Sequence, residues 1–180
     1  LNTLVADGRL VPLADGDPRA VSADATSARR VTYHDPCYLG RHNQVYSPPR
    51  ELLGALPGVE LAEMPRHREA SFCCGAGGAR MWMEETIGER IGTVRAAEAV
   101  ATGASTIATA CPFCTVMLGD GVAAHARAAG DASAPAAPDG AASTGTRAPA
   151  GPDASDARPT VGVPEVADIA VLLRDRLDRG

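Results

Sequence analysis

Five cysteines carry most of the chemical potential of this 180-residue chain. They occur as a single residue, an adjacent pair, and a pair separated by two residues, with two long gaps between these groups. An odd number of cysteines without a visible secretory signal argues against a disulfide framework. Thiolates are soft ligands that suit iron–sulfur clusters and zinc, so we favour metal binding. The candidate metal ligands are Cys37, Cys73, Cys74, Cys111 and Cys114.

Zinc binding and dithiol redox chemistry are the competing interpretations. A structural zinc ion takes four ligands, usually as two spaced pairs, so the adjacent Cys73 and Cys74 fit it poorly and a fifth cysteine would be left over. A multi-iron cluster can use neighbouring cysteines on different irons, which favours iron–sulfur. The segment 111–114 (Cys-Pro-Phe-Cys) also resembles a thioredoxin-type dithiol, an interpretation that the three other cysteines weaken.

Glycines and a histidine close to the cysteines complete the candidate site. Glycines leave room for the backbone to approach a cofactor and to point N–H groups at sulfur. The candidate cofactor-binding residues are Gly75, Gly77 and Gly78. The weak candidates for a catalytic role are Cys74 and His34. His34 could form a hydrogen bond near a cluster or move a proton, and an ordinary bond to the backbone is at least as well supported.

Other residues near the cysteines have simpler interpretations. Arg41 and Arg80 could offset the charge of an anionic cluster, hold an acidic substrate, or be solvated. Asp35 before a proline is typical of a turn. Residues 81–83 (Met-Trp-Met) are expected to pack in the core, with shielding of the site as the alternative. The remaining histidines, His42, His67 and His125, are expected at the surface.

Hydrophobic patterns place the cysteine segments at the ends of strands. Residues 31–33, 59–64 and 106–110 predict strands. Residues 47–56 and 83–102 predict helices between them. The second helix has an apolar stripe at helical spacing, made of Ile87, Ile91, Val94, Ala97 and Ala101.

The alternation of strands and helices predicts the fold class. It is α/β, a small parallel-sheet (Rossmann-like) cysteine-rich domain with flanking helices. Parallel sheets bind ligands outside the carboxyl ends of their strands. We therefore expect the three cysteine groups to converge at that edge.

Composition divides the chain into four segments. Residues 1–30 are a mixed lead-in from a missing upstream region, with a short strand expected at 10–13. Residues 31–120 carry every cysteine and form the predicted domain. Residues 121–162 are rich in alanine, proline and glycine and predict a disordered insertion. Residues 163–180 predict a helix that packs back on the domain. Because no methionine begins the chain, we expect it to be part of a longer protein.

Charge and hydropathy exclude two classes of function. The 17 basic residues, all arginine, face 22 acidic ones and form no basic stripe, which argues against nucleic-acid binding. No apolar run approaches the roughly 20 residues that span a membrane. We expect a cytoplasmic protein, with any attachment to the inner face of the plasma membrane made through the missing upstream part.

The cysteine segments and their flanks resemble a known family. Residues 34–41 (HDPCYLGR), 72–78 (FCCGAGG) and 111–114 (CPFC) resemble the cysteine-rich CCG domain found in heterodisulfide reductases and in the iron–sulfur subunits of glycolate oxidases. The likeness covers residues 31–122. It is greatest to the C-terminal part of large actinobacterial iron–sulfur-binding reductases, in which a membrane segment and a ferredoxin-type module precede two CCG units.

The resemblance implies a cofactor and a function. It implies a 4Fe-4S cluster, cubane or non-cubane, with all five cysteines as ligands. The domain would then belong to a heterodisulfide reductase-like oxidoreductase that relays electrons from a ferredoxin-type module to a disulfide, quinone or flavin partner. The implied partners are the upstream ferredoxin-type module, a second CCG module, and a membrane electron-transfer protein or flavoprotein. A zinc-stabilised interaction domain and a metal-free dithiol oxidoreductase are the alternatives.

Overall fold

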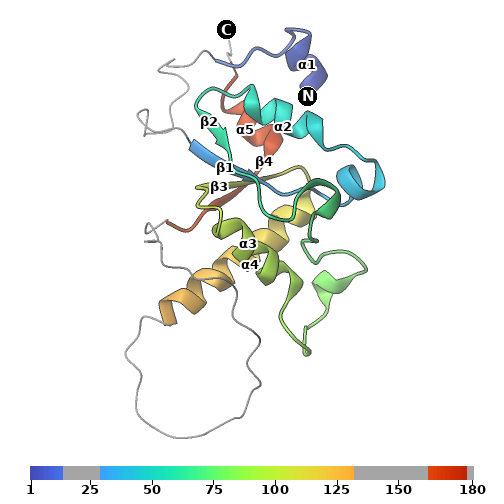
Figure 1. Ribbon diagram of the computed structural model, residues 1–180, viewed down its shortest axis with the longest axis vertical. Coiled ribbons are helices and arrows are strands. Elements are labelled where there is room, and N and C mark those ends of the chain that lie inside the picture. The colour runs from blue at the N-terminus through green and yellow to red at the C-terminus, as the bar shows by residue number, and fades with distance from the viewer. Residues whose placement is uncertain (14–28, 132–161, 178–180) are drawn as a thin grey trace, which may run out of the picture.

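A four-stranded parallel sheet forms the centre of the molecule (Figure 1). The computed structural model describes residues 1–13, 29–131 and 162–177. The strands are β1 (Arg29–Tyr33), β2 (Val59–Leu61), β3 (Thr106–Thr109) and β4 (Glu165–Asp168). They pair in the order β2-β1-β3-β4, and every pair is parallel. This arrangement confirms the predicted α/β class.

Helices cover both faces of the sheet. They are α1 (Asn2–Ala6), α2 (Ser47–Gly54), α3 (Ile91–Val100), α4 (Pro112–Asp131) and α5 (Ile169–Arg174). The apolar side chains of α2 and α5 pack with Val31 and Tyr33 on one face. Those of α3 and α4 pack with Ile107 on the other face. Figure 1 shows α3 and α4 on the opposite side of the sheet from α2 and α5. No helix in the described ranges is long and apolar enough to cross a membrane.

Helix α3 is shorter than predicted, and it buries a different face. It begins at Ile91 rather than near residue 83, since Gly88 takes a left-handed conformation (φ 75°) and Ile87 is 90% exposed. The predicted apolar stripe is therefore wrong. The buried face consists of Gly92, Arg95, Ala96 and Ala99. Apart from Arg95 these residues are small, which lets α4 pack closely against this face through Gly121.

Helix α4 extends beyond the predicted start of the insertion. Disorder was expected from residue 121, but the helix continues to Asp131, and Gly121 and Val122 are buried. The alanines that suggested low complexity are also the strongest helix formers, and they extend the helix. Residues 132–161 of the predicted insertion lie outside the described residues.

The C-terminal segment is a strand followed by a short helix, not one helix from residue 163. Residues 165–168 pair in parallel with β3, and this pairing overrides the helical pattern. Asp168 then caps α5, because its side chain accepts a hydrogen bond from the Ala170 N–H. Ile169 and Leu173 of α5 pack against α2 in the core.

Two further predicted strands differ from the structure. Residues 10–13 form no strand, and Pro12 makes one isolated antiparallel bridge with Leu177. The strand expected at 59–64 ends at Leu61. Residues 14–28 of the lead-in are outside the described part of the chain.

Two glycines bring α3, α4 and the adjacent-cysteine loop into close contact. A Cβ atom on Gly121 of α4 would lie 2.6 Å from the carbonyl oxygen of Gly92 of α3. A Cβ atom on Gly92 would lie 3.1 Å from the carbonyl oxygen of Cys74. The backbones of three segments that carry or support the cysteines are thus in direct contact.

Candidate metal centre

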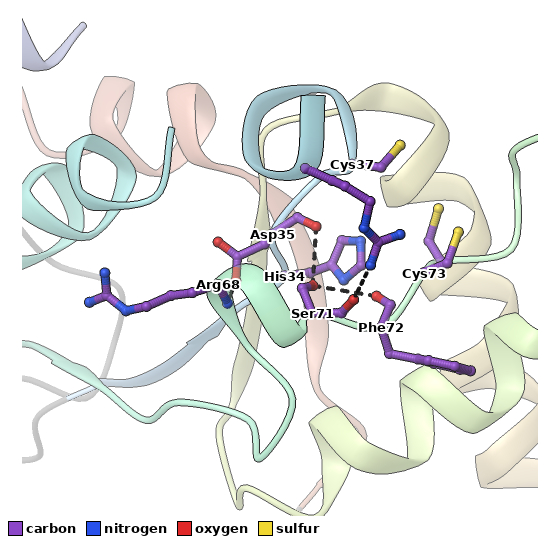
Figure 2. A pocket seen from close by; sticks show the side chains of 9 residues that line it. His34, Asp35, Cys37, Arg68, Ser71, Phe72 and Cys73 are labelled. Atoms are coloured by element: carbon purple, nitrogen blue, oxygen red, sulfur yellow. Dashed lines mark hydrogen bonds between the residues drawn. The ribbon is translucent and has the colours of Figure 1, made fainter. Parts of the chain in front are cut away.

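The carboxyl ends of β1 and β3 place two of the cysteine groups at one edge of the sheet. β1 runs into residues 34–37, and β3 runs into Cys111 and the first turn of α4, which carries Cys114. The loop with Cys73 and Cys74 completes the arrangement. It lines a pocket together with His34 and Cys37 (Figure 2).

Cys74 and Cys114 form the centre of the site. Their side chains are buried, and their sulfur atoms lie 3.3 Å apart although the residues come from different segments. A ring nitrogen of His34 and these two sulfur atoms all lie within 4.8 Å of one another. Three potential metal ligands from three separate segments are therefore gathered in the interior.

The position directly after the adjacent cysteines requires a glycine. Gly75 has a φ of 89°, and a Cβ atom there would lie 3.2 Å from the backbone nitrogen of Gly92. Its N–H donates to the Cys73 sulfur at 3.3 Å. Gly77 and Gly78 are exposed, with open space where a Cβ atom would lie. The backbone N–H groups of Gly75 and Gly77 both favour a Cys73 thiolate.

Without a metal, the surroundings favour the protonated thiols of the adjacent cysteines Cys73 and Cys74. The hydrogen bond with Cys74 and then burial raise the pKa of Cys73 well above its ordinary value. The contact with Cys114 is the largest cause that raises the pKa of Cys74 to about 11. A metal would have to displace these protons, so its binding would release protons to the solvent.

The other two cysteines lie farther out. Cys37 is exposed and lines the same pocket as Cys73, and Figure 2 shows both side chains at one end of it. Cys111 is half-buried against the α3/α4 core and does not line that pocket. The structure thus joins Cys74 and Cys114 directly and places Cys37 and Cys73 beside them, with Cys111 one helical turn from Cys114.

His34 is buried and held by an arginine. The Nε atom of Arg95 donates to Nδ1 of His34 at 3.1 Å. The backbone N–H of His34 donates to the carbonyl of Ala108 in β3. Burial and then the positive charge of Arg95 lower the pKa of His34 to about 3, so its ring is neutral.

Comparison with known proteins identifies this arrangement. Residues 31–119 match the family described as "CCG: Cysteine-rich domain". This segment belongs to the CCG domain family. No solved structure matches the chain.

Relatives of the CCG domain are larger proteins. The chain is 57% identical over 94 residues to "Probable iron-sulfur-binding oxidoreductase FadF" of Bacillus subtilis, covering 52% of the chain and 13% of that protein. It is 41% identical over 131 residues to "EtfAB:quinone oxidoreductase" of Syntrophomonas wolfei, covering 69% of the chain and 17% of that protein. It is 43% identical over 93 residues to one component of the dihydromethanophenazine:CoB–CoM heterodisulfide reductase of Methanosarcina barkeri, covering 52% and 23%. The chain thus spans less than a quarter of each of these relatives.

A buried ion-pair network in the CCG domain holds the loop that carries Cys37. Arg50 of α2 donates two hydrogen bonds to the carboxylate of Asp35, at 2.7 and 2.9 Å, and two to Glu63, at 2.5 and 3.0 Å. Asp35 also accepts from the Arg68 backbone N–H at 2.8 Å. Burial opposes ionisation of Asp35, but these bonds outweigh it and lower its pKa. Asp35 thus ties the Cys37 loop to the segment before Cys73.

A second buried network of the CCG domain lies behind His34. Arg95 is fully buried, and its Nη1 atom donates to Glu98 at 2.7 Å and to the Arg66 carbonyl at 2.8 Å. Glu98 also accepts from the backbone and side chain of Arg66, while Nη2 of Arg95 has no partner among the described residues.

The sequence analysis missed the two arginines at the centres of these networks, Arg50 and Arg95. Their signal was position: each is at helical spacing from buried residues, Leu53 in α2 and Ala99 in α3.

The remaining predicted site residues take peripheral roles. Arg41 lines the pocket and donates to the Ser71 carbonyl at 2.7 Å, and Arg80 forms an ion pair with Glu85. The prediction that residues 81–83 (Met-Trp-Met) pack in the core is wrong for two of them, since Trp82 and Met83 are 80% and 62% exposed. The surface expectation holds for His42, whereas His67 and His125 are half-buried.

Proposed function

We propose that the CCG domain binds an iron–sulfur cluster through its five cysteines and transfers electrons within a larger oxidoreductase. The observation that carries the proposal is the contact between Cys74 and Cys114. Two segments far apart in sequence bring their sulfur atoms to 3.3 Å, and Cys37 and Cys73 line the adjoining pocket. The chemistry of this donor set, soft sulfur with backbone N–H groups aimed at it, fits an iron–sulfur cluster.

The finer proposal is a 4Fe-4S cluster, in cubane or non-cubane form. The ligands would be Cys37, Cys73, Cys74, Cys111 and Cys114. When bound, the cluster supplies one-electron redox chemistry. The chain supplies the surroundings: the N–H groups of Gly75 and Gly77 stabilise thiolate charge, and burial of Cys74 and Cys114 excludes water from the inner side.

The names of relatives guide the proposal for the whole protein. We propose that electrons arrive from a ferredoxin-type module and leave to a disulfide, a quinone or a flavin partner, in a chain that also holds a second CCG module. One relative of the same domain is named a quinone oxidoreductase and another is named as part of a heterodisulfide reductase. A third, from Chromohalobacter salexigens, is named "Probable membrane-anchored ferredoxin". These names support association with a membrane, and we propose that the domain lies at its cytoplasmic face.

Metal analysis tests the proposal most directly. The 180-residue chain is purified without oxygen, and iron, acid-labile sulfide and zinc are measured on one sample. We expect about four irons and four sulfides per chain. One zinc without sulfide would instead indicate a structural zinc domain, and the redox function would be abandoned for this domain.

Single substitutions test the ligand set. Cys74→Ser and Cys114→Ser are expected to lose most of the bound iron, since these residues form the centre of the site. Thr115→Ala is the matched control, because Thr115 is half-buried on the same turn of α4 and carries no thiol. Full iron content in both cysteine variants would show that the assignment is wrong.

The two alternatives have specific structural counterparts. A zinc ion could use His34, Cys74 and Cys114, whose ligand atoms lie within 4.8 Å of one another. The dithiol alternative needs Cys111 and Cys114 to react together, but the sulfur contact in the structure joins Cys114 to Cys74. The first alternative therefore has the stronger geometric support, and it depends on which nitrogen of His34 is free.

A further inference from the structure

We propose that Arg95 holds His34 in the tautomer with its proton on Nε2, so that His34 does not ligate a metal and instead donates an N–H to the sulfur atoms of the centre. The tautomer is argued from hydrogen-bond geometry alone, whereas its effect on the reduction potential rests on the proposed iron–sulfur function. His34 would be a positioning residue that sets the reduction potential of the cluster. Arg95 would act through it.

The direction of the hydrogen bond between the two residues fixes the tautomer. A guanidinium group has five donors, no acceptor, and stays protonated in proteins. The bond from Arg95 Nε to His34 Nδ1, at 3.1 Å, therefore uses the lone pair of Nδ1. A neutral imidazole carries one proton, which must then be on Nε2.

The surroundings of Arg95 keep this bond in place. Arg95 has no exposed surface, and Nη1 is held by Glu98 and by the Arg66 carbonyl. The guanidinium group is thus fixed from a second side. The charged groups around His34 are Arg95 and Glu98 from α3 and Asp35 from its own loop.

The direction of the hydrogen bond at Nδ1 of His34 is opposite to that found in a metal-binding histidine. Such a histidine donates its second N–H to a carboxylate or a carbonyl, which leaves the other nitrogen free for the metal. In His34 the second nitrogen accepts instead, so a site of His34, Cys74 and Cys114 would require the Arg95 bond to break. A ring nitrogen of His34 lies within 4.8 Å of the Cys74 and Cys114 sulfur atoms, and Nδ1 is already taken by Arg95, which leaves the Nε2–H for the sulfur atoms. Hydrogen bonds to sulfur stabilise the more negative reduced cluster and raise its potential.

Nitrogen NMR of the metal-free chain tests the tautomer without any cofactor. In protein labelled with ¹⁵N at histidine, His34 is expected to show a protonated Nε2 and an unprotonated Nδ1 at neutral pH. Arg95→Met should release this preference, and Arg90→Met on the exposed start of α3 should not. An unprotonated Nε2 in the wild-type chain would overturn the proposal.

The reduction potential tests the role of the N–H in the loaded protein. His34→Leu removes the donor, while His34→Gln keeps an amide N–H within similar reach. We expect His34→Leu to disfavour reduction about tenfold, a shift of about 59 mV to lower potential for one electron. His34→Gln should restore most of that shift. Equal potentials in His34→Leu and wild type, or loss of iron from both variants with unchanged circular dichroism, would overturn it.

The two proposals fail in different ways. A wild-type chain without iron and sulfide contradicts the iron–sulfur function, yet the NMR measurement still decides the tautomer. If the chain instead binds zinc, the proposed tautomer requires that His34→Gln keep the zinc. Loss of zinc from that variant, with the fold intact, would show that His34 is a ligand and that the inference is wrong.

Discussion

Arg50 and Arg95 are both buried beside the loop after β1, but their ion-pair networks have opposite compositions. Arg50 lies between two carboxylates, those of Asp35 and Glu63. In the other network, one carboxylate, Glu98, lies between two arginines, Arg66 and Arg95. The first network has an excess of negative charge, and the second an excess of positive charge.

The difference separates a structural role from a functional one. Arg50 is paired with both carboxylates, so this network holds the loop and has no surplus positive charge to offer the metal centre. The Arg95 network has one more cation than it has carboxylates, and the Nη2 atom of Arg95 lacks a partner in the described part of the chain. A buried surplus cation is costly alone and favourable near an anionic group, such as thiolates that bind a metal.

The largest expected effect comes from breaking the network of Arg50, Asp35 and Glu63. Arg50→Met would leave the Asp35 carboxylate buried without its cation, and we expect a loss of about 3–5 kcal/mol in the free energy of unfolding. Urea denaturation of the metal-free chain measures it. Arg174→Met is the control, since its ion pair with Asp175 is exposed and should contribute under about 1 kcal/mol. Equal losses in the two variants would refute the structural role of Arg50.

Removing the surplus cation should cost less. In Arg95→Met the Glu98 carboxylate keeps both bonds from Arg66, and a buried cation disappears together with its unsatisfied Nη2 atom. We expect a loss of about 1–2 kcal/mol in the same urea experiment. A loss as large as that of Arg50→Met would show that the two networks are equivalent.

The smallest effect concerns acid stability. Burial opposes ionisation of Glu98, but the bonds from Arg66 and Arg95 outweigh it and lower its pKa. A lowered folded-state pKa stabilises the protein above the ordinary glutamate pKa, and this contribution is lost as the pH falls through the folded value. Glu98→Gln should therefore flatten the fall in unfolding free energy below about pH 5, by on the order of 1 kcal/mol.

A matched variant controls for the acid experiment. Glu60→Gln changes an exposed carboxylate of β2, and its pH profile should follow that of the wild type. If Glu98→Gln loses stability with acid as steeply as the wild type does, the carboxylate is not held by the arginines in solution.

The sequence predicted three of the four strands and the meeting of the cysteine segments, because both follow from topology. Strand β4 was missed, since residues 163–180 were expected to form a helix. Apolar runs identified β1 and β3, and parallel strands place their carboxyl ends together. Helix faces were harder to predict. Pattern analysis ranks residues by hydrophobicity, so it chose Ile87 over Gly92, whereas contact with α4 selects for small size.

The supporting residues of the site could not be derived from local patterns. Arg50 and Arg95 contribute through partners 15 and 61 residues away, Asp35 and His34, and that pairing depends on the packing of whole helices against the sheet. The ligand set of five cysteines stays a prediction. The structure adds which two of them are in contact.

The contact between Gly92 and Gly121 has a consequence for electron transfer. It joins the backbones of α3 and α4, and Gly92 also touches the backbone at Cys74. Cys74 and Cys114 are therefore carried by segments that cannot shift independently, since closely packed interiors resist compression. Ligands fixed in this way relax little when the charge of a bound group changes. The reorganisation energy of electron transfer should accordingly be small, set by two residues that have no side chain.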